Sequence, residues 1–129
     1  LVCQVAKDNG ADRDPLLRAR LAQAWMGLKV MRYNAMRMLS GPQDGALQRP
    51  AMIYKYYWSN WHRDLGKLAM DILRVDGDIV MEDPVRTRLQ QLFLFSRADT
   101  IYAGTNEIQL NIIAERALGM PRESRPART

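Results

Sequence analysis

Apolar residues recur at spacings of three and four along two long stretches of the chain, as on one face of an α-helix. In the first stretch, Asp14-Pro15 supplies an N-cap and a first helical residue, and Gly41-Pro42 supplies a stop. The apolar positions between them form one predicted inward face: Leu17, Leu21, Trp25, Leu28, Met31, Ala35 and Leu39. The pattern therefore predicts a long helix between these two signals.

The second stretch follows a loop of small and polar residues over 43–48, runs from about Pro50 to Leu73, and is broken by Asp76-Gly77-Asp78. Its apolar stripe consists of Ile53, Tyr57, Trp61, Leu65, Leu68 and Ile72. A second, aromatic face consists of Tyr54, Tyr56 and Trp58. Because this apolar surface is wide, we expect the helix to contact neighbours on more than one side.

Two further helices are expected on either side of a glycine turn. Asp83-Pro84 repeats the start signal, and the helix that follows runs to about Thr100. After Ala103-Gly104, Thr105 is the expected N-cap of the last helix, which Gly119-Met120-Pro121 stops. The pattern therefore predicts a break in the helical chain at the glycine.

This order of elements predicts an all-α fold, an antiparallel bundle of about four helices. Phe93-Leu94-Phe95 is too short for a convincing strand and lies inside a helical period. Residues 1–8 look like the end of a helix closed near Asn9-Gly10, and the sequence does not begin with Met. We therefore expect residues 1–129 to form a single bundle domain, a fragment of a longer subunit, with a disordered tail over residues 122–129.

Composition narrows the classes of function. The chain is 47% hydrophobic and 26% charged, as in soluble globular proteins, and no apolar run approaches the roughly 20 residues that span a bilayer. The net charge of +5 is spread out rather than gathered into a basic stripe with stacking aromatics, so we expect no nucleic-acid partner. The single cysteine, Cys3, allows no internal disulfide, which favours a reducing compartment and a cytoplasmic protein.

Two possible chemical signals are rejected. His62-Arg63-Asp64-Leu65 matches the start of a kinase catalytic loop, but it lies in the middle of a predicted helix and has Ala69 where that loop has Asn. One His and one Cys are too few for a zinc site, so no metal ligands are predicted. We expect His62 at a helix surface or an interface, and most acidic residues on solvent faces or at caps.

The strongest signal is the segment Tyr102-Ala103-Gly104-Thr105-Asn106-Glu107-Ile108-Gln109, in which a tight glycine turn leads directly into a helix N-terminus. Such geometry leaves backbone N–H groups free to meet an anion or a polarised oxygen. From the residues alone, a turn between two helices without a function is equally consistent with this pattern.

This segment resembles the C-terminal signature of the acyl-CoA dehydrogenase family. Residues 57–73 look like the second long helix of the family's C-terminal domain, residues 88–102 like the helix before its flavin turn, and residues 114–123 like its terminal segment. Together they cover nearly the whole chain, most specifically residues 54–123. The resemblance is greatest to the actinobacterial branch that works as two-subunit complexes on steroid side chains or related bulky CoA thioesters.

The resemblance implies a flavin-dependent oxidoreductase of lipid metabolism that carries out α,β-dehydrogenation of an acyl-CoA. In the family a carboxylate removes the α-proton, a hydride leaves the β-carbon for FAD, and N–H donors polarise the thioester carbonyl. By this match Ala103 and Gly104 bind substrate, through the Ala103 N–H and the close approach that glycine permits, while Thr105, Asn106 and Glu107 contact FAD. It also implies a tetramer-like homo- or hetero-oligomer and an electron-transfer flavoprotein as acceptor.

Two departures from the family pattern qualify the site. Many members place the catalytic glutamate where this chain has Ala103, which accepts no proton, so we predict no catalytic residue in the chain. The base would then precede Leu1 or lie on a partner subunit. Arg74 and Val75 stand where the family often has glycines that admit the FAD pyrophosphate. We therefore predict that this chain alone neither holds FAD tightly nor turns over substrate.

Two interpretations remain open. In the first, the chain is the C-terminal domain of a catalytic acyl-CoA dehydrogenase subunit. In the alternative, it is a non-catalytic helical structural or partner subunit of such a complex. A third class, a basic helical adaptor for nucleic acid, would require strongly salt-dependent binding. The many aromatic and Met residues on long helices predict association with a second copy or a partner.

Overall fold

The structure, a computed structural model, describes residues 1–40, 49–79 and 82–122. Every regular element in these residues is a helix: α1 (Val2–Asp8), η1 (Ala11–Arg13), α2 (Pro15–Ser40), α3 (Arg49–Leu73), η2 (Arg74–Gly77), α4 (Pro84–Ala98), α5 (Asn106–Ile112) and η3 (Ile113–Ala117). The predicted all-α fold is confirmed. The expected stop at Gly41-Pro42, the loop over 43–48 and the tail from residue 123 onward lie outside the described residues.

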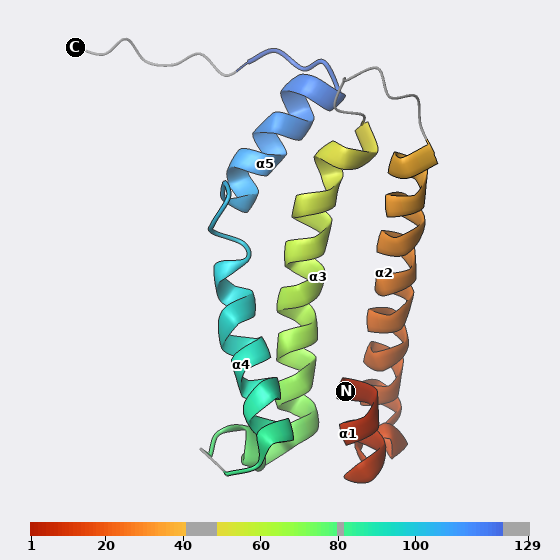
Figure 1. Cartoon of the computed structure of the whole chain (residues 1–129), viewed down its shortest axis with the longest axis vertical. Coiled ribbons are helices and arrows are strands. Elements are labelled where there is room, and N and C mark those ends of the chain that lie inside the picture. The colour runs from red at the N-terminus through yellow and green to blue at the C-terminus, as the bar shows by residue number, and fades with distance from the viewer. Residues whose placement is uncertain (41–48, 80–81, 123–129) are drawn as a thin grey trace, which may run out of the picture.

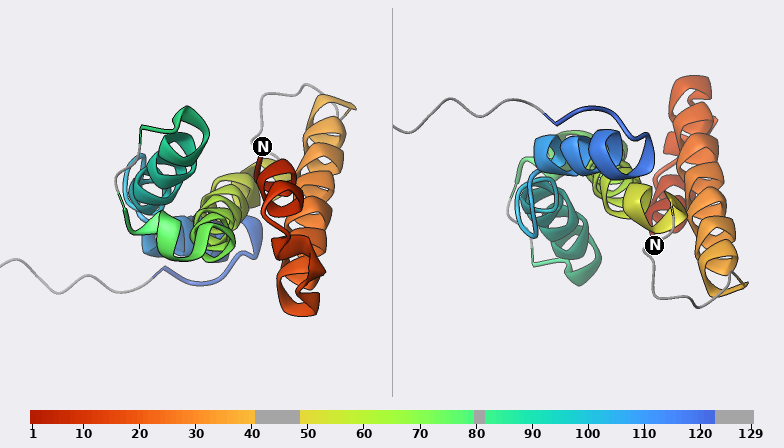
Figure 2. Two further views of the ribbon diagram at one scale, coloured as in Figure 1. Left: turned by 90° about the horizontal axis from the view of Figure 1, so that it is seen from below. Right: turned by 90° about the horizontal axis from the view of Figure 1, so that it is seen from above.

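Helix α3 is the centre of the arrangement. It lies between α2 on one side and α4 and α5 on the other, and α1 packs at its C-terminal end (Figure 1). Views along the bundle show α3 enclosed by these neighbours from several directions (Figure 2). The wide apolar surface predicted for this helix therefore has the several partners that it requires.

The predicted helix starts are confirmed by their caps. Asp14 Oδ1 accepts hydrogen bonds from the N–H groups of Leu16 and Leu17 at 2.8 and 3.3 Å. At the start of α4, Asp83 Oδ1 accepts in the same way from Val85 and Arg86 at 2.8 and 3.4 Å. In both cases the following proline has no N–H group that would need an acceptor. The Asp side chain and the proline together therefore leave fewer unpaired N–H groups at the helix start.

The best-buried side chains gather where α1, α3 and α4 meet. One cluster joins α1 and η1 to α3, with partly buried α2 residues packed against it, and the other joins α3 to α4. The first contains Ala6, Ala11, Leu68 and Ile72, and the second contains Ala69, Leu73 and Leu89. The C-terminal half of α3 is thus the core, whereas Ile53 and Tyr57 in its N-terminal half stay partly exposed.

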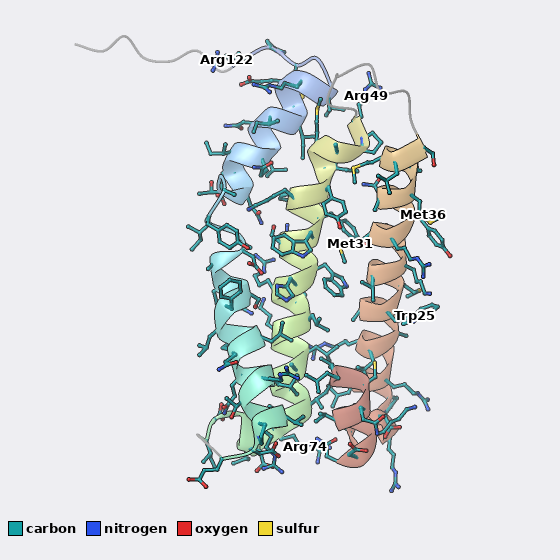
Figure 3. All side chains as sticks on the ribbon, viewed as in Figure 1. Trp25, Met31, Met36, Arg49, Arg74 and Arg122 are labelled. Carbon is teal, nitrogen blue, oxygen red and sulfur yellow. The ribbon has the colours of Figure 1, made fainter. Side chains whose placement is uncertain are left out.

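The inward face predicted for α2 is wrong in part. Trp25 and Leu39 are 57% and 80% exposed, and Leu28 is also exposed. Of the predicted positions, Met31 is buried, and Leu17 and Leu21 are partly buried against the core. Figure 3 shows Met31 between α2 and α3, while Trp25 points away from the bundle.

Small residues on α2 explain why part of its predicted inward face is exposed. A Cβ placed on Gly27 would lie 2.6 Å from Cδ1 of Trp61, so the indole ring of α3 occupies the space that glycine leaves. The Trp61 Nε1–H also donates to the Ala24 carbonyl at 2.8 Å. The close approach to one large ring therefore selects small residues at this level of α2, and the neighbouring Trp25 and Leu28 face outward.

Candidate functional site

The segment between α4 and α5, residues 99–105, breaks the helical path and is called the corner below. Ala103 and Gly104 have φ angles of +53° and +89°, both in the left-handed region. For a residue with a Cβ, this conformation costs about 1–2 kcal/mol. Among the residues that the structure describes, the backbone N–H groups of residues 103–105 have no hydrogen-bond partner. The predicted break and the predicted free amides are therefore both present.

Thr105 caps α5 as predicted. Its hydroxyl oxygen accepts from the Ile108 N–H at 3.4 Å. Hydrogen bonds from the backbone N–H of Glu107 and from the Thr105 hydroxyl hold the pKa of the Glu107 carboxyl below its usual range. The first turn of α5 therefore carries an ionised carboxylate, which complements the partial positive charge of the helix N-terminus.

Asn106 faces the protein rather than the solvent. Its side chain is buried, its Oδ1 accepts from the Ser59 hydroxyl at 2.8 Å, and its Nδ2 donates to Asn60 Oδ1 at 3.2 Å. Its backbone N–H donates to the Thr100 carbonyl at 3.0 Å. The polar groups of the Asn106 side chain therefore bond α5 to α3. In this Asn106 differs from Thr105 and Glu107, the two other residues matched to flavin contacts.

Lys55 on α3 joins the two ends of the corner. Its Nζ donates to the Asp99 carbonyl at 2.7 Å and to the Gly104 carbonyl at 3.1 Å. The same ammonium lies 5.8 Å from the centroid of the Tyr102 ring. A single cation therefore contacts the first residue of the corner, its aromatic residue and its glycine.

Asp99 is fully buried, and two side chains satisfy its carboxylate. The Tyr102 hydroxyl donates to its Oδ1 at 2.7 Å, and His62 Nδ1 pairs with its Oδ2. The hydrogen bond to this carboxylate raises the pKa of the Tyr102 hydroxyl. Asp99 is an exception to the expectation that most acidic residues lie on solvent faces or at caps. His62 is partly buried against it, at the interface between α3 and the end of α4 rather than on an open helix surface.

A sequence signal for these contacts does exist. Lys55, Ser59 and His62 are separated by four and three residues, so they lie on one face of α3. This set, called the polar stripe below, is easily overlooked beside the aromatic residues that alternate with it.

Arg74 follows the end of α3, at a position where the family resemblance led us to expect a glycine. Its φ is +56°, so the backbone keeps the left-handed conformation that a glycine would adopt. Its side chain is exposed beside the exposed Val75, at the end of α3 away from the corner (Figure 3). An exposed cationic side chain therefore occupies a position where a glycine was expected.

Two general features complete the description. Within the described ranges, no group of three or more His, Cys, Asp or Glu residues is arranged to hold a metal ion. None of the helices in the described part of the chain is both long enough and apolar enough to cross a membrane.

Residues 2–118 match the family model for the C-terminal domain of acyl-CoA dehydrogenases, and the chain therefore belongs to this family. The family predicted from the corner and its flanking helices is confirmed. The match extends from α1 to the end of the last helical turn, so it includes every element that surrounds the corner.

Individual relatives agree with this assignment. The chain is 48% identical over 124 residues to the acyl-CoA dehydrogenase IpdE1 of Mycobacterium tuberculosis, covering 95% of this chain and 31% of that protein. It is 49% identical over 120 residues to IpdE1 of Mycolicibacterium smegmatis, covering 93% of this chain and 29% of that protein. The chain thus spans about a third of the length of these relatives.

A solved structure shares the fold. The protein described as the Tcur3481-Tcur3483 steroid ACAD superposes with a TM-score of 0.80 at 29% sequence identity, covering 95% of this chain and 33% of that one. A variant of the same protein gives the same values. The actinobacterial relatives and this neighbour agree with the branch of the family that the sequence resembles.

Proposed function

We propose that this chain is the C-terminal domain of a flavin-dependent acyl-CoA dehydrogenase subunit that catalyses α,β-dehydrogenation of an acyl-CoA thioester. The observation that carries the proposal is the strained corner, in which the N–H groups of residues 103–105 have no partner among the described residues. Left-handed residues held against their preference are frequent at sites that must present a group in one orientation. The family match supplies the chemistry that such a site serves.

The corner suits the activation of a thioester. The α-proton of an acyl-CoA is a weak acid, so N–H donors are needed at the carbonyl oxygen, where negative charge grows as that proton leaves. In this proposal the Ala103 N–H is such a donor, and Gly104 allows the substrate to approach closely. Ala103 accepts no proton itself, so the base belongs to a segment before Leu1 or to a partner subunit.

The residues of the corner and of the first turn of α5 can supply only part of a binding site for FAD. FAD, when bound, accepts the hydride from the β-carbon. Thr105 and Glu107 would face it, and Asn106 would act indirectly by fixing both on α3 through Ser59. Because Glu107 is ionised at the start of α5, this place suits the neutral polar groups of FAD better than its phosphates. The glycines expected near Arg74 are absent, so the cofactor site is incomplete in this chain.

The substrate and partners are proposed from the relatives. The name of the solved neighbour joins two components and the word steroid. That name supports a bulky CoA thioester and a tetramer-like assembly, homo- or hetero-oligomeric, in which exposed apolar residues such as Trp25 and Leu39 of α2 contribute to an interface. An electron-transfer flavoprotein as acceptor and a cytoplasmic location follow from the family resemblance.

The decisive experiment compares two alanine substitutions at left-handed glycines in the full-length subunit with its partner. Gly104→Ala adds a methyl group at the corner, whereas Gly119→Ala, at φ +69°, adds the same group where no atom lies within 4 Å. We expect Gly104→Ala to lower kcat/KM for a steroid-type CoA thioester roughly 10- to 100-fold, because a displaced donor stabilises the transition state poorly.

Gly119→Ala should change kcat/KM less than about 2-fold, because α5 and η3 separate it from the corner and the added methyl group meets no described atom within 4 Å. Anaerobic bleaching of the flavin by the thioester gives the rate of the chemical step in each variant. Equal rates for both variants and the parent would instead favour the alternative, a non-catalytic structural subunit. Absence of any flavin bleaching by acyl-CoA thioesters in the parent complex would refute the proposed function.

A further inference from the structure

The polar stripe of α3 contacts three successive parts of the corner. His62 pairs with the Asp99 carboxylate where α4 ends. Lys55 donates to the carbonyls of Asp99 and Gly104, on either side of the turn. Ser59 donates to the Asn106 side chain where α5 begins. One face of one helix therefore contacts the corner at its beginning and its turn, and contacts α5 where the corner ends.

These contacts hold a conformation that the chain would not adopt alone. Ala103 lies in the left-handed region at a cost of about 1–2 kcal/mol. The free backbone amides of residues 103–105 contribute no hydrogen bond of their own to offset that cost among the described residues. The compensation comes from charge-assisted hydrogen bonds at the flanking residues, which are stronger than neutral ones.

We propose that Lys55 and Asp99 are positioning residues that fix the direction of the Ala103 N–H. Neither residue contacts the substrate in this proposal, which depends on the proposed function only for the identity of the group that the amide meets. Lys55 holds the two carbonyls at a separation that keeps Ala103 left-handed. Asp99 holds Tyr102, the residue before Ala103, through the hydroxyl contact at 2.7 Å.

Lys55 has a second effect on the same turn. The Gly104 carbonyl and the Thr105 N–H belong to one peptide group, and a hydrogen bond to the carbonyl strengthens the N–H as a donor. The ammonium at 3.1 Å from that carbonyl therefore makes the Thr105 amide a better donor as well as fixing its direction.

The test uses the full-length subunit with its partner and substitutes Lys55 in two ways. Lys55→Met keeps the length of the side chain and removes the donors, whereas Lys55→Arg retains a cation with several N–H donors. The matched control is Lys67→Met on the same helix, because Lys67 is exposed and its ion pair is a 3.9 Å contact with Asp64, remote from the corner. Circular dichroism and flavin content establish that each variant is folded and loaded.

The readout is the infrared stretch of the thioester carbonyl, labelled with carbon-13, in the enoyl-CoA product bound to the oxidised enzyme. A hydrogen bond from the Ala103 N–H lowers this frequency, and a merely structural role of Lys55 would leave it unchanged in folded, loaded enzyme. We expect Lys55→Met to lose most of the shift and roughly 10- to 100-fold in kcat, with the Kd for the thioester changed less than about 3-fold. Lys55→Arg should restore part of both losses.

The possible failures are distinguishable. An unshifted carbonyl in the parent enzyme that nevertheless dehydrogenates the thioester would overturn the donor role of the corner and with it this inference. A parent shift that Lys55→Met retains in full would overturn the role of Lys55 and leave the proposed function intact. A loss in Lys67→Met equal to that in Lys55→Met would show a general effect of charge on α3 and would also overturn the inference. If Lys55→Met fails to fold, Lys55→Gln, which also removes the ammonium, takes its place, and a folded Lys55→Gln that keeps the full shift overturns the inference.

Discussion

Gly66 lies at a close approach of α3 and α4, and replacing it with alanine tests how tightly the two helices pack. A Cβ at this position would lie 2.6 Å from Ser96 Oγ and 3.0 Å from the Cα of Phe93. The first contact is with a buried side chain whose hydroxyl donates to the Phe93 carbonyl at 2.8 Å. The second contact is with backbone, which moves only if α4 shifts as a whole.

The expected change in the free energy of unfolding follows from three contributions. Overpacking of a well-packed site costs about 1–3 kcal/mol. Turning the Ser96 hydroxyl away from the added methyl group forfeits a hydrogen bond worth about 0.5–1.5 kcal/mol. Alanine in place of glycine within a helix returns about 1 kcal/mol. We therefore expect Gly66→Ala to destabilise the protein by about 0.5–3.5 kcal/mol.

Urea unfolding followed by far-ultraviolet circular dichroism measures this change, and a double-mutant cycle with Ser96→Ala tests its cause. Removing the Ser96 hydroxyl relieves the shorter contact, so the double variant should recover about 1 kcal/mol relative to the sum of the single changes. A Gly66→Ala protein that is more stable than the parent by about 1 kcal/mol, the gain in helix propensity alone, would refute the close packing of α3 and α4 described above.

Two further predictions concern pH. The lowered pKa of Glu107 means that its stabilising effect is present above the ordinary value of 4.5 and is lost as the pH falls through the folded-state pKa. Glu107→Gln should therefore flatten the acid side of the stability profile measured by urea unfolding, and identical profiles would contradict the contact with the Thr105 hydroxyl. The raised pKa of Tyr102 gives the opposite sign: its stabilising effect is present below the ordinary value of 10.0 and is lost as the pH rises through the folded-state pKa. An absorbance titration of phenolate should show a late phase that Tyr102→Phe removes, and an unchanged late phase in that variant would contradict the pairing with Asp99.

Local signals in the sequence were sufficient for the helices and for the position of the corner. Asp14-Pro15 and Asp83-Pro84 cap the helices they were expected to start, because the cap uses only groups within a few residues of one another. The break before Thr105 is likewise local, because glycine adopts positive φ readily and threonine caps the helix that follows. The family resemblance rests on the same short segments, and the match over residues 2–118 confirms it.

The orientation of α2 could not be obtained in this way. Its larger apolar residues recur at helical spacing, yet Trp25 and Leu39 lie outside and Gly27 lies against α3. The spacing of apolar residues shows which of them share a face of the helix. Which face packs against the bundle depends on the neighbouring side chain that fills the space next to a glycine. Here that neighbour is Trp61, a residue 34 positions away in the sequence.

The chain's own sequence determined that helices form, where they start, and that a glycine turn with a threonine cap separates the last two. Only the tertiary structure decided that Asp99 is buried between His62 and Tyr102, and that Lys55 bridges the carbonyls of Asp99 and Gly104. The reason is physical: caps and turns are satisfied by neighbours along the chain, whereas a buried charge is tolerated only when partners from other elements meet it.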